Sequence, residues 1–249
     1  RIDQSGTSGL NTAALGIHGF FFTSVLNDIN PLDDPNGTYQ LLEHFSLANA
    51  IYGYDPTQAI ADVITDVGSR FIDAGIIGSP PRKEGSTRFY ASGPDVEVFA
   101  ELGRYGLDVR PLGLEIGQAS GIKMCYAAFT KGTTALTTTL LTVAHSMGLY
   151  EPLVQEFQKS QGERYRTMER QIPTMPPRAY RWIGEMEEIA QTFADAGLTP
   201  KFHQGAADLY RFVASTPLAE ETPERRDRDR TLMQVIDVLA ASLKAQPPA

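Results

Sequence analysis

The sequence predicts an α/β domain followed by an all-helical domain, and three observations carry this prediction. Short strand-like and helical segments alternate between residues 57 and 112, as in layered α/β folds. From Gly117 onward apolar residues recur at a period of about 3.6, and no segment has the pattern of a strand. Glycines stand where the predicted helices end, which is where they commonly stop a helix. The domain boundary is therefore expected near Gly117.

The first domain has its clear elements only after residue 57. The preceding segment is rich in Gly, Asn, Asp, Ser and Thr, with a turn cluster over residues 30–37. A short amphipathic helix is predicted from Thr57 to Gly68, followed by strands over 70–77 and 87–92. A helix over 94–105, closed by Gly106, and a strand over 107–112 complete the domain.

The second domain is predicted to consist of helices alone. A long helix over 118–147 carries an apolar stripe that we expect to face the core, made of Ile122, Cys125, Phe129, Leu136, Leu140, Val143 and Met147. Further helices are expected over 151–171, 177–196 and 203–214. A charged run over 220–230 precedes a last amphipathic helix from Leu232 to Leu243. The predicted organisation is thus 1–116, 117–215 and 216–249.

Composition excludes several classes of partner. The chain has 249 residues, and 22 basic against 30 acidic side chains give a net charge of −8, which argues against nucleic acid or an anionic membrane as the main partner. The single cysteine, Cys125, cannot form an internal disulfide, which fits the reducing cytoplasm. No apolar run approaches the roughly 18 residues of a membrane span. The chain begins with Arg1 and no signal peptide is recognisable, so we expect that translation began further upstream.

The common signatures of cofactor and metal sites are missing from the sequence. No two glycines are separated by a single residue, so the dinucleotide fingerprint G-x-G-x-x-G cannot occur. The pairs Gly6/Gly9 and Gly16/Gly19 are poor substitutes without a clear preceding strand. The four histidines show no ligand spacing, so no metal site is expected.

Lys123 is the residue most suited to chemistry. It lies early in an apolar helix, beside the predicted domain boundary, where a cleft is expected. Apolar surroundings disfavour the charged form of a lysine and lower its pKa toward the range useful for proton transfer. The alternative is an ordinary solvated lysine. Lys131 follows two turns later, roughly 80° around the helix, and either shares the cleft or points away from it.

Two motifs and three longer stretches resemble one enzyme family. Residues 71–81 (FIDAGIIGSPP) resemble the substrate loop D-A-P-V-S-G-G of β-hydroxyacid dehydrogenases, and residues 117–123 (GQASGIK) resemble their lysine motif G-x-x-x-x-x-K. Three longer stretches resemble a subfamily with a poorly characterised 6-phosphogluconate-dehydrogenase-like C-terminal domain. They are ASGIKMCYA with TKGTT, WIGEMEEIA, and AGLTP with GAADLY. The resemblance covers residues 57 to 214.

The resemblance implies a Rossmann-like domain that is incomplete or atypical at its start, since the family's cofactor domain is longer than the segment before Gly117. It also implies NAD or NADP as cofactor, a small hydroxy acid as substrate, and Lys123 as the acid/base. Gly78 and Ser79 would hold the substrate carboxylate through N–H groups and the Ser79 hydroxyl, with Ser120 and Lys131 as further substrate contacts.

Three departures from the family pattern bear on these roles. Ile77 stands where the family commonly has Ser, and Tyr126 and Ala127 stand where an Asn often contacts the substrate. Asn49 resembles the remnant of an asparagine-containing cofactor loop, followed by an intruding Tyr-Gly-Tyr-Asp segment. The substrate contacts are therefore expected to differ from the common pattern.

Two functions remain open from the sequence. One is an NAD(P)-dependent hydroxyacid dehydrogenase. The other is a catalytically inactive relative or fragment that serves as a dimerisation or small-molecule-binding module, which the missing glycine fingerprint favours. The resemblance implies a homodimer, and the apolar stripe over 232–243 needs a partner, within the chain or outside it.

Overall fold

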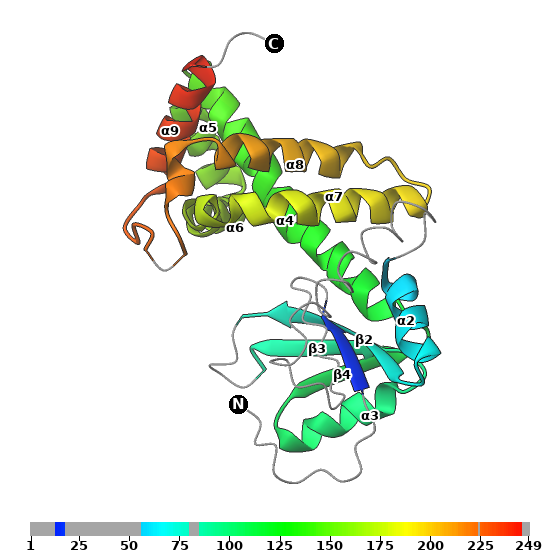
Figure 1. Cartoon of the computed structure of the whole chain (residues 1–249). Helices are drawn as coiled ribbons and strands as arrows, with labels where there is room; N and C mark the ends of the chain where they lie inside the picture. Colours follow the sequence, from blue (N-terminus) through cyan, green and yellow to red (C-terminus); the bar gives the residue numbers. More distant parts are fainter. Residues whose placement is uncertain (1–12, 18–55, 80–84, 224, 246–249) are drawn as a thin grey trace. The chain divides into compact units, whose positions relative to one another are not determined.

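The computed structural model describes residues 13–17, 56–79, 85–223 and 225–245. They form two compact units, which divide between Lys123 and Met124. The first unit contains the sheet and its helices, and the second is helical (Figure 1). The division falls inside the helix that the sequence analysis places first in the helical domain, because the first turn of this helix is bonded to the sheet, as described below.

The first unit contains a mixed four-stranded sheet in the order β1-β2-β3-β4. β1 pairs in parallel with β2, β2 in antiparallel with β3, and β3 in parallel with β4. The strands are β1 (Ala13–Ile17), β2 (Arg70–Gly78), β3 (Thr87–Ser92) and β4 (Asp108–Gly113). The last three confirm the predicted strands to within a residue. β1 was not predicted, because Ala-Ala-Leu-Gly-Ile has neither alternation nor a run of β-branched residues.

Helices cover parts of both faces of the sheet. α3 (Val96–Ala100), which continues as the 3-10 helix η1 (Glu101–Tyr105), packs Val96 and Phe99 against Ile72 and Ala91. α2 (Pro56–Asp66) packs on Phe71, whose side chain points to the opposite face from its neighbour Ile72. The predicted stops after these helices are confirmed by the left-handed φ angles of 77° at Gly68 and 90° at Gly106.

The second unit confirms the all-helical prediction. No strand lies between Gln118 and Ala245 in the part of that range that the structure describes. The predicted helix over 151–171 is instead two helices, because the chain bends at Gln161, with φ −135° and ψ 35°. The helices are α4 (Gln118–Ser146), α5 (Tyr150–Ser160), α6 (Gly162–Gln171), α7 (Ala179–Asp195), α8 (Lys201–Ala214) and α9 (Leu232–Ala245), with the short 3-10 helices η2 (Ile172–Thr174), η3 (Pro176–Arg178) and η4 (Pro217–Glu220).

The core of the helical unit gathers side chains from nearly all of these helices. Leu141 of α4, Met186 of α7 and Tyr210 of α8 are fully buried in it. α9 contributes its apolar stripe, with Leu232, Val235, Ile236 and Leu239 buried in the same cluster. The partner that this stripe needs is therefore within the chain.

The predicted core face of α4 is wrong. Phe129, Leu136 and Met147 are 71%, 65% and 65% exposed, and Cys125 is also exposed. The buried face consists mostly of small residues, with Met124 and Leu141 as its large ones: Ala127, Ala128, Thr134, Ala135, Thr138 and Thr142. Helical periodicity marks an apolar face but does not say which partner covers it. In this chain Tyr126, Phe129, Leu136, Val143 and Met147 of α4 are exposed, whereas Met124 and Leu141 are buried.

Among the described residues, no helix combines the length and the apolar character needed to cross a membrane.

Candidate functional site

The first turn of α4 is bonded to the sheet through a buried carboxylate. Asp73, in the middle of β2, is 1% exposed. Its Oδ2 accepts a hydrogen bond from the Ser120 backbone N–H at 2.9 Å, and its Oδ1 accepts one from the Ser120 hydroxyl at 2.7 Å. The Ser92 hydroxyl donates to Oδ2 at 3.3 Å and accepts from the Ala119 N–H at 3.0 Å.

These contacts cap the N-terminus of α4 from two strands. The first N–H groups of a helix have no partner within it. Here the N–H of Ala119 donates to a side chain of β3, and the N–H of Ser120 donates to a side chain of β2. A carboxylate at this end also interacts favourably with the helix dipole. The arrangement therefore fixes where α4 begins relative to the sheet.

Gly75 allows the same helix turn to approach β2 closely. A Cβ atom at Gly75 would lie 2.7 Å from the carbonyl oxygen of Ala119 and 3.3 Å from Cβ of Lys123. Only a residue without a side chain accepts such an approach to a backbone oxygen. Lys123 is thus positioned directly over β2, three residues before the strand ends at Gly78.

The predicted substrate loop begins where β2 ends. Gly78 pairs with Thr87, and a Cβ at Gly78 would meet the carbonyl oxygen of Ser86. The Ser79 N–H donates to that same oxygen at 3.1 Å, and the Thr87 hydroxyl donates to the Ser79 carbonyl. The Ser79 N–H, expected to hold a carboxylate, is therefore engaged within the hairpin in this structure.

The remaining predicted site residues are placed as follows. Ser120 is 6% exposed and uses both its N–H and its hydroxyl on Asp73, which favours an anchoring role over a substrate contact. Lys131 lies in the helical unit, where its amine forms an ion pair with Glu185 and lies 5.7 Å from the centre of the Trp182 ring. Asn49 lies outside the described residues.

Sequence reasoning missed a row of polar side chains on the sheet face that bears Asp73 and Gly75. Tyr90 is the cross-strand partner of Gly75, and Arg110 is the partner of Tyr90. Arg88 and Asp108 form the next pair along, beside Ile77. The period of two in β3 could have indicated that Arg88, Tyr90 and Ser92 share a face, but only the register places them beside Lys123.

Charge pairing holds this row together. Arg110 donates to both carboxylate oxygens of Asp108 at 3.0 Å, and its guanidinium lies 5.8 Å from the centre of the Tyr90 ring. The hydrogen bond from Arg110 and the charges of Arg110 and Arg88 lower the pKa of Asp108. Arg88 donates to the Gly85 carbonyl oxygen at 3.2 Å.

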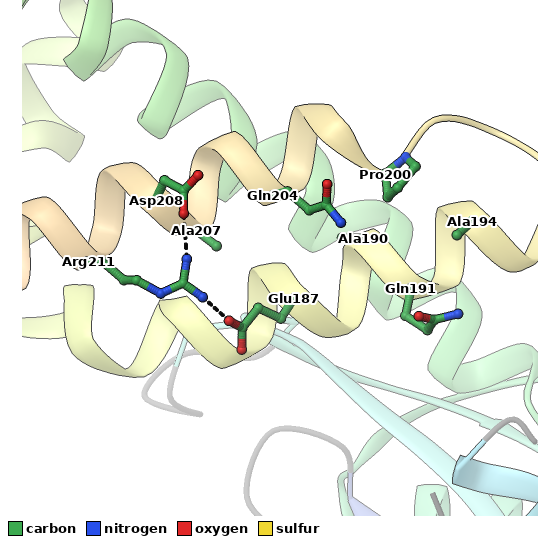
Figure 2. A pocket seen from close by; sticks show the side chains of 9 residues that line it. All are labelled: Glu187, Ala190, Gln191, Ala194, Pro200, Gln204, Ala207, Asp208 and Arg211. Atoms are coloured by element: carbon green, nitrogen blue, oxygen red, sulfur yellow. Dashed lines mark hydrogen bonds and ion pairs between the residues drawn. The ribbon is translucent and has the colours of Figure 1, made fainter. Parts of the chain in front are cut away.

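A separate hollow lies between α7 and α8 (Figure 2). Ala190, Ala194 and Ala207 line it together with polar side chains. Figure 2 shows Arg211 reaching the carboxylates of both Glu187 and Asp208. Because Arg211 is already paired with two carboxylates, the hollow is a weaker candidate for a reactive site than the sheet face beside Lys123. In the described ranges, no three His, Cys, Asp or Glu side chains are grouped to hold a metal ion.

The fold and the site define a class of protein: an α/β unit joined by a long helix to an all-helical unit, with a lysine on the first turns of that helix. Residues 144–213 match the family model of a domain of unknown function, DUF1932. A conserved protein of unknown function, whose structure was reported as similar to 3-hydroxyacid dehydrogenases, is 34% identical, with a TM-score of 0.50, over 58% of this chain and 56% of that one. These findings support the resemblance of the chain to the β-hydroxyacid dehydrogenase superfamily.

Two further relatives are less similar. A conserved hypothetical protein from Sinorhizobium meliloti 1021 shares the fold, with 23% identity and a TM-score of 0.60 over 76% of this chain and 62% of that one. An uncharacterised 28.5 kDa protein of Methanothermus fervidus is 27% identical over 96 residues, which are 39% of this chain and 37% of the relative. The chain thus matches less than two thirds of the length of each of these relatives.

Proposed function

We propose that this chain is an NAD(P)-dependent oxidoreductase acting on a small hydroxy acid, with Lys123 as its acid/base. The observation that carries the proposal is the position of Lys123 over Gly75 of β2, on the strand that leads to Gly78 and Ser79. The superfamily, in which a lysine of this motif serves as acid/base, supports the same role.

The chemistry assigned to this chain is proton transfer. Oxidation of a hydroxy acid removes a proton from the hydroxyl oxygen and a hydride from the carbon that bears it, and leaves a carbonyl. A neutral Lys123 amine would accept the hydroxyl proton, and in the reverse direction its ammonium would return the proton to the carbonyl oxygen. A nicotinamide would supply the hydride chemistry.

The sequence has no G-x-G-x-x-G, and the described residues show no substitute for its phosphate-binding loop. This favours the second candidate, a catalytically inactive relative that binds a small molecule or a second subunit. The two candidates differ in one property: the enzyme binds NADH or NADPH, and the inactive relative does not.

The test begins with the fluorescence of NADH and NADPH titrated with the purified chain. If either binds, hydroxy acids are screened for nicotinamide reduction, and the active substrate is used with Lys123 variants. Lys123→Ala should lower kcat about 10²- to 10⁴-fold. Lys123→Arg should fail as well, since a guanidinium keeps its proton near neutral pH. Lys159→Ala, at an exposed lysine of α5, is the matched control. Full activity of Lys123→Ala would refute the assignment.

We further propose that the chain forms a homodimer through the exposed stripe of α4. The stripe repeats every seven residues. One line of it consists of Phe129, Leu136 and Val143, and a second line consists of Tyr126, Leu140 and Met147, where the first spacing is fourteen. Of these, all but the partly buried Leu140 are at least 47% exposed. Apolar residues at this spacing suit packing against another helix, and a second copy brings an identical stripe.

A further inference from the structure

We propose that Arg88, with Tyr90 and Arg110 beside it, binds the carboxylate of the substrate, which gives the site a side-chain anion anchor. This proposal rests on the proposed function for the identity of the ligand as a hydroxy acid. Its physical basis is the arrangement of the sheet face next to Lys123.

The geometry follows from the strand register. Lys123 lies over Gly75, and Gly75, Tyr90 and Arg110 form one row across β2, β3 and β4. Two residues further along, toward Gly78, the neighbouring row on this face contains Ile77, Arg88 and Asp108. Consecutive same-face positions on a strand are about 7 Å apart. Arg88 therefore stands one such step along and one strand across from Gly75, over which Lys123 lies, on the side where β2 ends.

Charge makes this row suitable for an anion. Together with the row of Gly75, Tyr90 and Arg110, it holds two guanidinium groups against the single carboxylate of Asp108, so this part of the sheet face carries a positive charge within a chain of net charge −8. Arg110 commits two of its donors to Asp108, whereas Arg88 donates one N–H to the Gly85 carbonyl. A guanidinium has further N–H donors in a planar fork that matches a carboxylate.

Arg88 also supplies N–H donors for a carboxylate, which the hairpin at Ser79 does not. The Ser79 N–H, the expected carboxylate donor, is bonded to the Ser86 carbonyl. Arg88 lies one residue after Thr87, on the strand that begins at this hairpin. The hydroxyl and the carboxylate of a small hydroxy acid are only a few bonds apart. A substrate with its hydroxyl at Lys123 would therefore have its carboxylate toward Arg88.

The test uses malonate as the probe and needs no nicotinamide. Malonate is titrated into the chain at constant ionic strength, and binding is followed by NMR on the arginine Nε–Hε signals, with uncharged malonamide as the control ligand. Saturable binding of malonate but not malonamide is expected. Arg88→Gln should weaken it about tenfold or more, the loss expected for a charge-assisted hydrogen bond. Arg110→Gln should weaken it less, since that guanidinium is shared with Asp108.

Arg70→Gln is the matched control, because Arg70 belongs to the same sheet but points to the opposite face, near Asp95. It should change the malonate affinity by less than about twofold. Unchanged binding in Arg88→Gln, an equal loss in Arg70→Gln, or no saturable binding in the unmodified chain would each overturn the proposal. Failure of the nicotinamide titration alone would refute the enzyme function and leave this anion site standing.

Discussion

The carboxylate of Asp73 accepts hydrogen bonds from both the backbone N–H and the hydroxyl of Ser120, which lies 47 residues later in the chain. This pair joins the middle of β2 to the first turn of α4. Because Lys123 follows one turn after Ser120, the same bonds determine where Lys123 stands over the sheet.

Asp73→Ala should lower the free energy of unfolding by about 2–3 kcal/mol. The substitution removes the cap of α4 and leaves the buried Ser120 N–H and hydroxyl without their acceptor. Ser120→Ala, which keeps the N–H bond and loses only the hydroxyl, should cost about 1 kcal/mol. Urea unfolding followed by circular dichroism measures both. Equal stability of Asp73→Ala and the unmodified chain would show that the carboxylate does not anchor the helix.

Gly75→Ala should displace the first turn of α4. The added methyl group would meet a backbone oxygen at 2.7 Å, so strand or helix must move, at a cost of about 1–3 kcal/mol. Gly103→Ala is the matched control, because nothing lies within 4 Å of a Cβ there. The midpoints of thermal unfolding should separate the two variants, and identical midpoints would contradict the close approach.

Leu136→Glu should dissociate the proposed dimer. A charge in the centre of the α4 stripe would be buried without a partner in the interface, while in the monomer it is exposed to water. Leu198→Glu makes the same change at an exposed leucine between α7 and α8. Light scattering at micromolar concentration should report a dimer for the unmodified chain and for Leu198→Glu, and a monomer for Leu136→Glu. A monomeric unmodified chain would refute the dimer.

His203 should make the helical unit less stable in mild acid. Its ring packs on Phe193 with centroids 4.4 Å apart, its Nδ1 is buried without a hydrogen-bond partner among the described residues, and burial lowers its pKa below 6.5. The unfolded chain therefore binds this proton more readily than the folded one, so stability falls as the pH drops below about 6.5. His203→Phe keeps the ring contact with Phe193 and should remove this loss of stability at low pH. If the thermal midpoints of both proteins fall by the same amount between pH 7.5 and 5, His203 is not the cause of the acid sensitivity.

Local patterns predicted much of this fold. The strands over 70–78 and 87–92 have apolar or alternating runs bounded by glycine, and Gly68 and Gly106 adopt the left-handed conformation that ends a helix. These signals act over a few residues. The break at Gln161 was missed because apolar periodicity continues across it.

The site was less predictable, because its residues come together through register and packing. No local pattern connects Asp73 with Ser120, or Gly75 with Lys123 and Tyr90. The outward face of α4 was mistaken for its core face for a related reason. A periodic apolar stripe has the same appearance whether it is covered by its own chain or by another molecule.

The threonines on the buried face of α4 have a consequence for how this helix keeps its alignment. Thr134, Thr138 and Thr142 each donate their hydroxyl to the carbonyl four residues earlier, so their polar atoms are satisfied by their own helix. These threonines therefore contribute little hydrogen bonding to neighbouring helices, and the contact of the Thr134 hydroxyl with Gln171 Oε1 is 3.3 Å long. The alignment of α4 then depends on bonds that leave the helix, foremost the one from the Tyr210 hydroxyl to the Lys131 carbonyl at 2.6 Å. The Tyr210 hydroxyl thus joins α8 to the middle of α4, as the carboxylate of Asp73 joins β2 to its first turn.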